Sequence, residues 1–166
     1  ESLDNLGSAL ADVDDYNHGE YVSRDKEIVV ADKKITKIAD VLDKVGSAMD
    51  DGKYYSRMKE SFDKVQKLSK EILDTMGSPD KKEEREKKHY EYEKELNIFK
   101  LHTAEYLAEQ QQQLSKTEDD KATQAILKKI EVASTLQSKV QQLQEDMVAA
   151  FTAEMRAEVN RITRTA

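Results

Sequence analysis

Apolar residues recur at steps of three and four along almost the whole chain, and this spacing restricts the available folds most. The last third shows the pattern plainly, with Ile126, Ile130, Ala133, Leu136, Val140, Leu143 and Met147 in succession. Such steps place side chains on one face of an α-helix. Only five glycines and one proline occur in 166 residues to interrupt helices. The sequence therefore predicts an all-α protein built from long amphipathic helices.

The apolar stripe is narrow, because 37% of the residues are hydrophobic and another 37% are charged. Disordered chains share this composition, but they lack regular apolar spacing. A lone helix with a narrow stripe is unstable in water, so such helices bury their stripes against one another. We therefore expect an elongated antiparallel coiled-coil bundle that leaves one seam for a second chain, in a homodimer or a heterodimer.

Two turn signals divide the chain. Gly77 suits a helix end, and Ser78 and Pro79 suit the start of the next helix. A second polar connection follows, in which Thr117 and Asp120 have the spacing of a capping box. Short connections make consecutive helices antiparallel. The predicted organisation is an acidic amphipathic segment over 1–18 and a helical bundle over 19–166, with helices at about 20–76, 79–114 and 118–166.

Gly52 leaves one alternative open. The apolar stripe passes this glycine and resumes at Tyr55, which favours one continuous helix over 20–76 and three antiparallel helices in all. Glycine also suits the residue after a helix C-terminus, so the segment around Gly52 could instead be a turn. The bundle then has four helices.

No catalytic, cofactor-binding or metal-binding residues are predicted, and an enzyme is not expected. The chain has no cysteine and its glycines are isolated, which excludes thiolate chemistry and glycine-rich phosphate loops. Glu86 and His89 match the Glu-x-x-His motif of di-iron bundles once, whereas such a centre needs the motif twice. Lysines and glutamates alternate over 81–88, so no continuous basic face is available for nucleic acid.

Two sets of residues are candidates for binding. Lys33, Lys34, Lys37 and Lys44 share a broad side of the first helix and are candidate contacts for anionic lipids. Aspartates are interleaved with these lysines, as on an ordinary solvated face. Leu3, Leu6, Leu10 and Val13 form the apolar face of the N-terminal segment. Membrane-lying helices favour a basic polar face, and this one is acidic, so packing on the bundle or on a partner is favoured over insertion.

The order of these features resembles the BAR domain of the sorting nexins. The resemblance rests on the amphipathic segment over 3–13, the acidic break after it, and a helix that starts at Glu20-Tyr21 and continues through Lys34 to Leu42. It also rests on Phe62-Asp63-Lys64-Val65 and Leu68-Ser69 before the turn at Gly77, and on Phe151 and 153–158 in the last helix. The resemblance implies a three-helix coiled coil that dimerises into a curved module, beside a phosphoinositide-binding domain elsewhere in the protein.

The resemblance makes a BAR-like dimerisation module our first functional expectation. Such a module senses or remodels membrane curvature in endosomal trafficking, in the cytoplasm and peripherally on anionic endosomal membranes. The alternative is a helical scaffold or tethering coiled coil that binds other proteins without membrane contact. Neither function requires a cofactor or a nucleic acid.

Overall fold

The computed structural model describes residues 24–50, 52–75 and 78–165, and the side chains of most residues between 31 and 146. Its elements are α2 (Arg24–Lys44), α3 (Gly46–Met49), α4 (Tyr54–Thr75), the 3-10 turn η2 (Pro79–Lys81), α5 (Lys82–Lys116) and α6 (Asp120–Thr165). Four of these are long helices, α3 is a single turn, and the described ranges contain no strand. The prediction of an all-α fold is confirmed.

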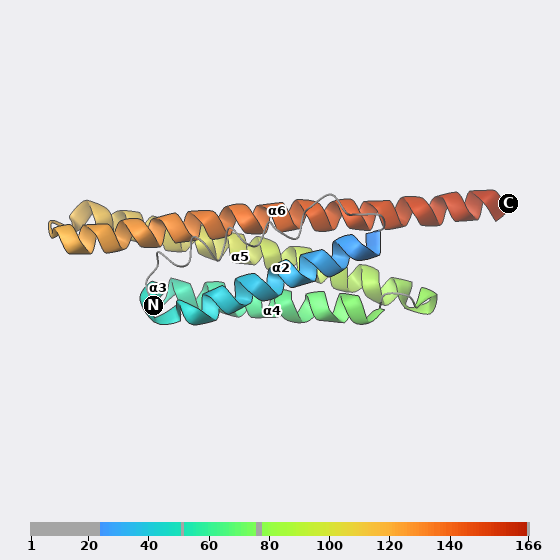
Figure 1. Ribbon diagram of the computed structural model, residues 1–166, viewed down its shortest axis with the longest axis horizontal. Helices are drawn as coiled ribbons and strands as arrows, with labels where there is room; N and C mark the ends of the chain where they lie inside the picture. Colours follow the sequence, from blue (N-terminus) through green and yellow to red (C-terminus); the bar gives the residue numbers. More distant parts are fainter. Residues whose placement is uncertain (1–23, 51, 76–77, 166) are drawn as a thin grey trace.

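The four long helices form an antiparallel bundle (Figure 1). Helix α2 packs on α4 and α6, and α5 packs on the same two helices. Each helix therefore has two neighbours around a shared core. This is the four-helix arrangement that the sequence left open as an alternative.

The turn at Gly52 replaces the continuous helix favoured over 20–76. Gly52 has φ of +79°, a conformation that glycine adopts without steric cost. Its backbone N–H donates to Asp50 Oδ1 at 2.7 Å, which fixes the turn. The apolar stripe gives the reason for the break. Buried Met49 and Tyr55 lie six residues apart, one fewer than the seven residues of a heptad. Each residue turns an α-helix by roughly 100°, so in a straight helix the apolar face of α4 would point roughly 100° away from the apolar face of α2.

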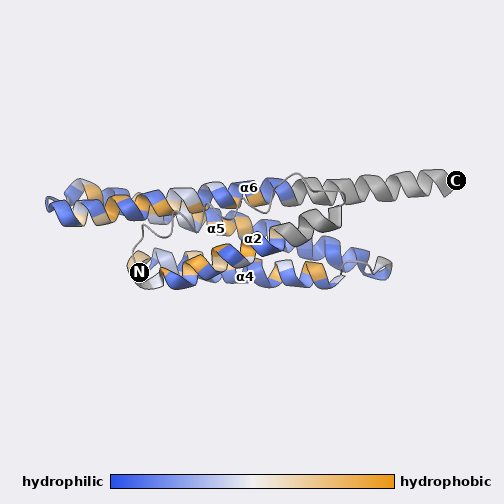
Figure 2. Cartoon of the chain, in the orientation of Figure 1, coloured by the Kyte–Doolittle hydropathy of each residue, from blue (hydrophilic) through white to orange (hydrophobic). Residues whose placement is uncertain are grey.

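The core lies between the four helices, with apolar faces inward and polar faces outward (Figure 2). Side chains that are 0–1% exposed come from every long helix: Ile35, Ile38 and Leu42; Met58, Phe62 and Val65; Tyr92, Leu96 and Phe99; Ala133, Leu136 and Val140. Phe62 and Phe99 meet edge to face at a centroid distance of 5.0 Å. Among the described side chains, the narrow stripe of each long helix is thus buried within one chain.

Two tyrosines hold the α2–α4 turn against the bundle. Tyr55 on α4 donates a hydrogen bond to the carbonyl of Leu42, and Tyr106 on α5 donates to the carbonyl of Met49 at 2.7 Å. The last carbonyls of a helix have no partner within the helix, so these hydroxyl groups satisfy groups that would otherwise be buried without a hydrogen bond. The rings of Tyr55 and Tyr106 also meet edge to face.

The other two connections lie where the sequence predicts turns. Pro79 occupies the first position of η2, and Ser78 precedes it without a side-chain capping bond. Arg85 Nη1 instead donates to the carbonyl of Thr75 at 2.8 Å and caps the end of α4. At the start of α6 the capping residue is Asp119, whose Oδ2 accepts a bond from the N–H of Ala122 at 2.9 Å. The capping box predicted from Thr117 does not form.

Helices α5 and α6 have 35 and 46 residues, whereas α2 and α4 have 21 and 22. Tyr106 marks the level at which α3 ends, and α5 continues beyond it to Lys116. On α6, Asp146 pairs with Lys34 on α2. Met49 follows Lys34 by about fifteen residues, and α6 runs in the opposite direction, so Met49 lies level with the α6 residue about fifteen positions before Asp146, near Glu131. Residues 108–130 therefore project past the α2–α4 turn as a two-helix arm about 13 Å long, which we call the overhang hairpin (Figure 1).

Candidate functional site

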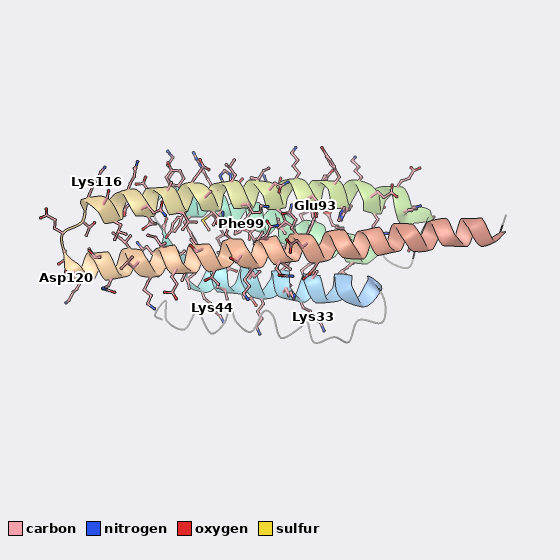
Figure 3. All side chains as sticks on the ribbon, turned by 90° about the horizontal axis from the view of Figure 1, so that it is seen from above. Lys33, Lys44, Glu93, Phe99, Lys116 and Asp120 are labelled. Atoms are coloured by element: carbon pink, nitrogen blue, oxygen red, sulfur yellow. The ribbon has the colours of Figure 1, made fainter. Side chains whose placement is uncertain are left out.

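The four lysines predicted to contact lipid do not share one surface. Lys33 and Lys44 are exposed and lie apart along α2 (Figure 3), and Lys37 is half-buried. Lys34 is only 2% exposed, and its Nζ lies 3.4 Å from Asp146 Oδ2 on α6. Lys34 therefore joins two helices of the bundle, and its assignment as a lipid contact is corrected.

The predicted apolar face of the N-terminal segment, formed by Leu3, Leu6, Leu10 and Val13, lies outside the described residues. Its packing on the bundle or on a partner stays a prediction.

A polar layer crosses the apolar core near the middle of α2. Its members are Asp32 and Lys34 on α2, Ser69 on α4, Tyr92 and Glu93 on α5, and Gln144 and Asp146 on α6. The Oγ of Ser69, fully buried, donates to Asp32 Oδ1 at 2.8 Å. Gln144 Nε2 donates to Glu93 Oε2 at 2.8 Å. A buried polar layer is best satisfied in a single alignment of its helices, so this layer favours one register of the bundle.

Tyr92 is the member of the polar layer with no hydrogen bond. Its side chain is 0% exposed, and its hydroxyl has no partner among the described residues. Burial raises the pKa of the phenol, and the carboxylates of Glu93, Asp32 and Asp146 raise it further. A general acid or base works best with a pKa near the operating pH, and Tyr92 is shifted away from that range. The layer therefore has the properties of a structural network.

His89 does not belong to a metal centre in the described part of the chain. Its ring stacks on Tyr92 at a centroid distance of 6.3 Å, and burial lowers its pKa to about 4. Glu86, the other half of the predicted motif, is exposed. No group of three His, Cys, Asp or Glu residues within the described ranges could hold a metal ion. His89 is a neutral packing residue at pH 7.

A shallow surface cavity of about 380 Å³ lies beside the α2–α4 turn. It is lined by Gly46, Asp50, Tyr55, Ser56, Lys59, Glu60 and Asp63. The ammonium group of Lys59 bonds to Asp43 at 2.8 Å and to Asp63 at 3.3 Å, so two of the neighbouring carboxylates are already paired with it. The buried side chain of the lining, Tyr55, already donates its hydroxyl to the carbonyl of Leu42.

The overhang hairpin differs from the rest of the bundle, because only two of the described helices form it. Gln110 on α5 is 0% exposed, and neither atom of its amide has a hydrogen-bond partner within the described ranges. Ile126 on α6 is buried as well, at 6% exposed. Leu127 beside it is 42% exposed and is one of three large apolar side chains at the described surface, with Tyr90 and Leu101. The hairpin thus combines a closed seam with one exposed apolar side chain.

Comparison with known proteins adds no relative to these observations: no family model, curated protein or solved structure matches the chain. Among the described helices, none has a stretch that is both long enough and apolar enough to cross a membrane. Sequence reasoning missed both the overhang hairpin and the polar layer. The hairpin depends on the turn at Gly52, and the layer depends on pairs such as Lys34 and Asp146 that lie far apart in the sequence.

Proposed function

We propose that this chain is a helical scaffold that binds other proteins, with the overhang hairpin as its binding arm. The observation that carries the proposal is the difference in helix length between the two halves of the bundle. Helices that only complete their own bundle gain nothing from extending beyond it, because the extension buries little apolar surface. A projecting pair of helices instead presents side chains that a partner can reach from several directions.

The arm is suited to bind a helix of a partner protein. Tyr106 anchors its base by a hydrogen bond to Met49, so the hairpin extends from a fixed position. Preorganised elements lose little conformational entropy when they bind. Amphipathic helices bind to helical surfaces through apolar anchors at spaced positions, and Leu127 supplies one such anchor.

The charges at the tip favour specificity over long-range attraction. Lys116 and Lys121 lie close to Asp119 and Asp120 at the tip, and the labelled residues of α5 and α6 meet there in Figure 3. Charges of mixed sign produce little net field at a distance, but they penalise partners whose charges do not match on contact.

The two exposed leucines provide the test. A photo-crosslinking amino acid at Gln124, on the arm, is compared in cells with one at Lys67, on the exposed side of α4. The captured protein is identified and titrated against purified wild-type chain, Leu127→Glu and Leu101→Glu. Because a charge replaces an apolar anchor, Leu127→Glu should weaken binding at least tenfold, roughly the loss of 1.4 kcal/mol.

Leu101→Glu is the matched control, because Leu101 is 61% exposed on α5 beside the bundle and away from the arm. It should leave the affinity within about twofold of the wild type. Equal losses from both substitutions, or capture from Lys67 alone, would exclude the hairpin as the binding arm.

Peripheral binding to anionic membranes is a second candidate function, supported by the exposure of Lys33 and Lys44 on α2. The support is weaker than for the scaffold, since Asp40 and Asp43 are exposed on the same helix and Lys34 is inside the bundle. The curvature-sensing dimer in endosomal trafficking that the resemblance implies is the specific form of this second candidate.

A further inference from the structure

An exposed line of side chains runs along α5 on the side opposite to the core. Tyr90 and Leu101 are 72% and 61% exposed, the highest values among the large apolar side chains that the structure describes. They lie eleven residues apart, which is about three turns plus 20°, so both side chains leave the helix in nearly the same direction. Exposed Asn97 and Ala104 lie on the same line. Two large apolar side chains thus share one open helical face, about 16 Å apart along the axis.

This face is open because the neighbours of α5 lie on its other sides. Among the described long helices, α5 packs on α4 and α6. Figure 3 shows α5 at one edge of the bundle, with outward side chains that no other described helix covers. The face is also distinct from the apolar stripe of α5, which is buried in the core.

We propose that a second copy of this chain packs on this face, with the two α5 helices antiparallel around a twofold axis. Tyr90 of each copy then packs against the partner's Leu101, so the interface contains two identical contacts between large apolar side chains. The step from 90 to 101 in one helix matches the same step in the reversed helix. Lys94 and Asn97 lie between the two contacts, close to the axis. Such an isologous interface is the commonest form of homodimer.

Charges select the antiparallel orientation. Lys87 and Lys94 are both exposed and lie on the same line of α5. A parallel pair would place each of them against the same lysine of the partner, and like charges in contact oppose association. In the antiparallel pair Lys94 faces the partner's Asn97, and Lys87 lies beside the partner's Glu105. Each lysine therefore meets a neutral or an acidic side chain.

Charges also select the register. A shift of one copy by seven residues would bring Lys100 level with the partner's Lys100 and would place Leu101 against the partner's Asn97. In the proposed register Lys100 is instead level with the partner's Glu93, and Leu101 faces the partner's Tyr90. A second copy supplies this order of apolar and charged residues, whereas an unrelated helix would need the same order to fit equally well.

The dimer has a consequence for the overhang hairpin. Helix α5 runs toward the tip of the hairpin, so antiparallel pairing places the two hairpins at opposite ends of the dimer. A dimer with two binding arms links two partner proteins. This consequence rests on the proposed function of the hairpin, but the dimer itself does not.

Sedimentation equilibrium tests the proposal. The mass of the wild type should rise from 19.0 kDa toward twice that value as the concentration increases. Leu101→Glu removes an apolar anchor at two places in each dimer. A loss of about tenfold for each anchor gives an increase of about a hundredfold in the dimer Kd. The matched control is Leu127→Glu, which alters an exposed leucine on α6 and should keep the dimer Kd within about twofold of the wild type.

Cysteine mixtures test the register, because the chain contains no cysteine of its own. Lys87 of one copy faces the partner's Ala104, and both residues are exposed. Chains carrying Lys87→Cys are mixed with chains carrying Ala104→Cys and oxidised, and a disulfide-linked heterodimer should appear on a non-reducing gel. In the matched control Gln111→Cys replaces Ala104→Cys. Gln111 is one heptad further along α5, about 10 Å past the level of Lys87, which is too far for a disulfide.

A wild type that sediments at 19.0 kDa even at about 1 mM overturns the proposal. A dimer whose Kd is unchanged by Leu101→Glu also overturns it, and so does equal cross-linking of the two cysteine mixtures. These outcomes leave the proposed function intact, because binding of a partner protein is tested by capture at Gln124 and by Leu127→Glu. Loss of partner binding without loss of the dimer would in turn leave this proposal intact.

Discussion

Two buried tyrosines on α5 differ in whether their hydroxyl group makes a hydrogen bond. Tyr106 donates to the Met49 carbonyl at 2.7 Å, whereas the hydroxyl of Tyr92 has no partner in the part of the chain that the structure describes, and both side chains are 0% exposed. A buried polar group without a hydrogen bond costs roughly 1–3 kcal/mol, while a satisfied one contributes roughly 0.5–1.5 kcal/mol. The same substitution should therefore affect the two positions in opposite directions.

Tyr92→Phe should raise the free energy of unfolding by about 1 kcal/mol, because it removes an unpaired hydroxyl and keeps the ring. Tyr106→Phe should lower it by about 1 kcal/mol, because the Met49 carbonyl loses its donor. Urea denaturation followed by circular dichroism gives both values. A loss of stability in Tyr92→Phe equal to that in Tyr106→Phe would mean that the Tyr92 hydroxyl has a partner in solution.

His89 makes the stability of the bundle depend on pH. Burial lowers its pKa from the ordinary 6.5 to about 4, so the unfolded chain binds a proton in this range that the folded chain does not. Its contribution to folding is therefore complete above about pH 6.5 and decreases as the pH falls toward 4. Allowing for partial exposure of the ring, we expect a loss of about 1 kcal/mol between pH 7 and pH 5.

Glu93 acts in the opposite sense, because burial raises its pKa and the folded chain then takes up a proton before the unfolded chain does. Comparing variants removes this contribution. His89→Gln should lose less free energy of unfolding between pH 7 and pH 5 than the wild type. The control His102→Gln should lose as much as the wild type, because it retains His89. Identical urea midpoint shifts in wild type and His89→Gln would show that His89 is not protonated differently in the two states.

At the residue scale, the sequence predicts core positions well and polar partners poorly. The stripe expected on α6 includes Ala133, Leu136 and Val140, which are all fully buried. Helical spacing identifies such residues because it reports which face is apolar. Lys34 was expected at the surface, since nothing near it in the sequence reveals Asp146, its partner 112 residues away. Burial of a charge depends on a tertiary contact, and local spacing contains no information about it.

At the scale of elements, the helix bounds of the second half were predictable within a few residues. Helices expected over 79–114 and 118–166 appear as η2 with α5 and as α6, ending at Lys116 and Thr165. Their turn residues, Gly77 to Pro79 and the polar loop before Asp120, are strong local signals. The first half was less predictable, because a stripe that continues on both sides of Gly52 resembles a single helix.

The spacing across Gly52 nevertheless contained the correct answer. The step from Met49 to Tyr55 is six residues, and this departure from the heptad is what separates the faces of α2 and α4. The overhang hairpin then follows from helix length together with the alignment that the Tyr106–Met49 and Lys34–Asp146 contacts impose. Once the first half folds into helices of 21 and 22 residues, helices of 35 and 46 residues must extend beyond them. The candidate binding arm is thus a consequence of a single turn.

At the scale of the whole molecule, charge distinguishes the two candidate functions. The chain has 34 acidic and 27 basic residues, a net charge of −7 at pH 7. Anionic membranes attract proteins through clusters of basic residues, at roughly 1 kcal/mol for each residue near the surface. On α2 the exposed Lys33 and Lys44 are accompanied by exposed Asp40 and Asp43, which offset that attraction.

We therefore expect the wild-type chain not to co-sediment with vesicles containing phosphatidylserine, even at about 0.01 M salt, where the Debye length is about 30 Å. Asp40→Lys combined with Asp43→Lys serves as the positive control. Both positions are exposed, and Asp43→Lys also removes the surface ion pair with Lys59, which should cost at most about 1 kcal/mol, so the bundle should stay folded. The added charge should produce binding that disappears at about 1 M salt. Salt-sensitive binding of the wild type that is lost in Lys33→Glu/Lys44→Glu would instead support the membrane function and exclude a scaffold without membrane contact.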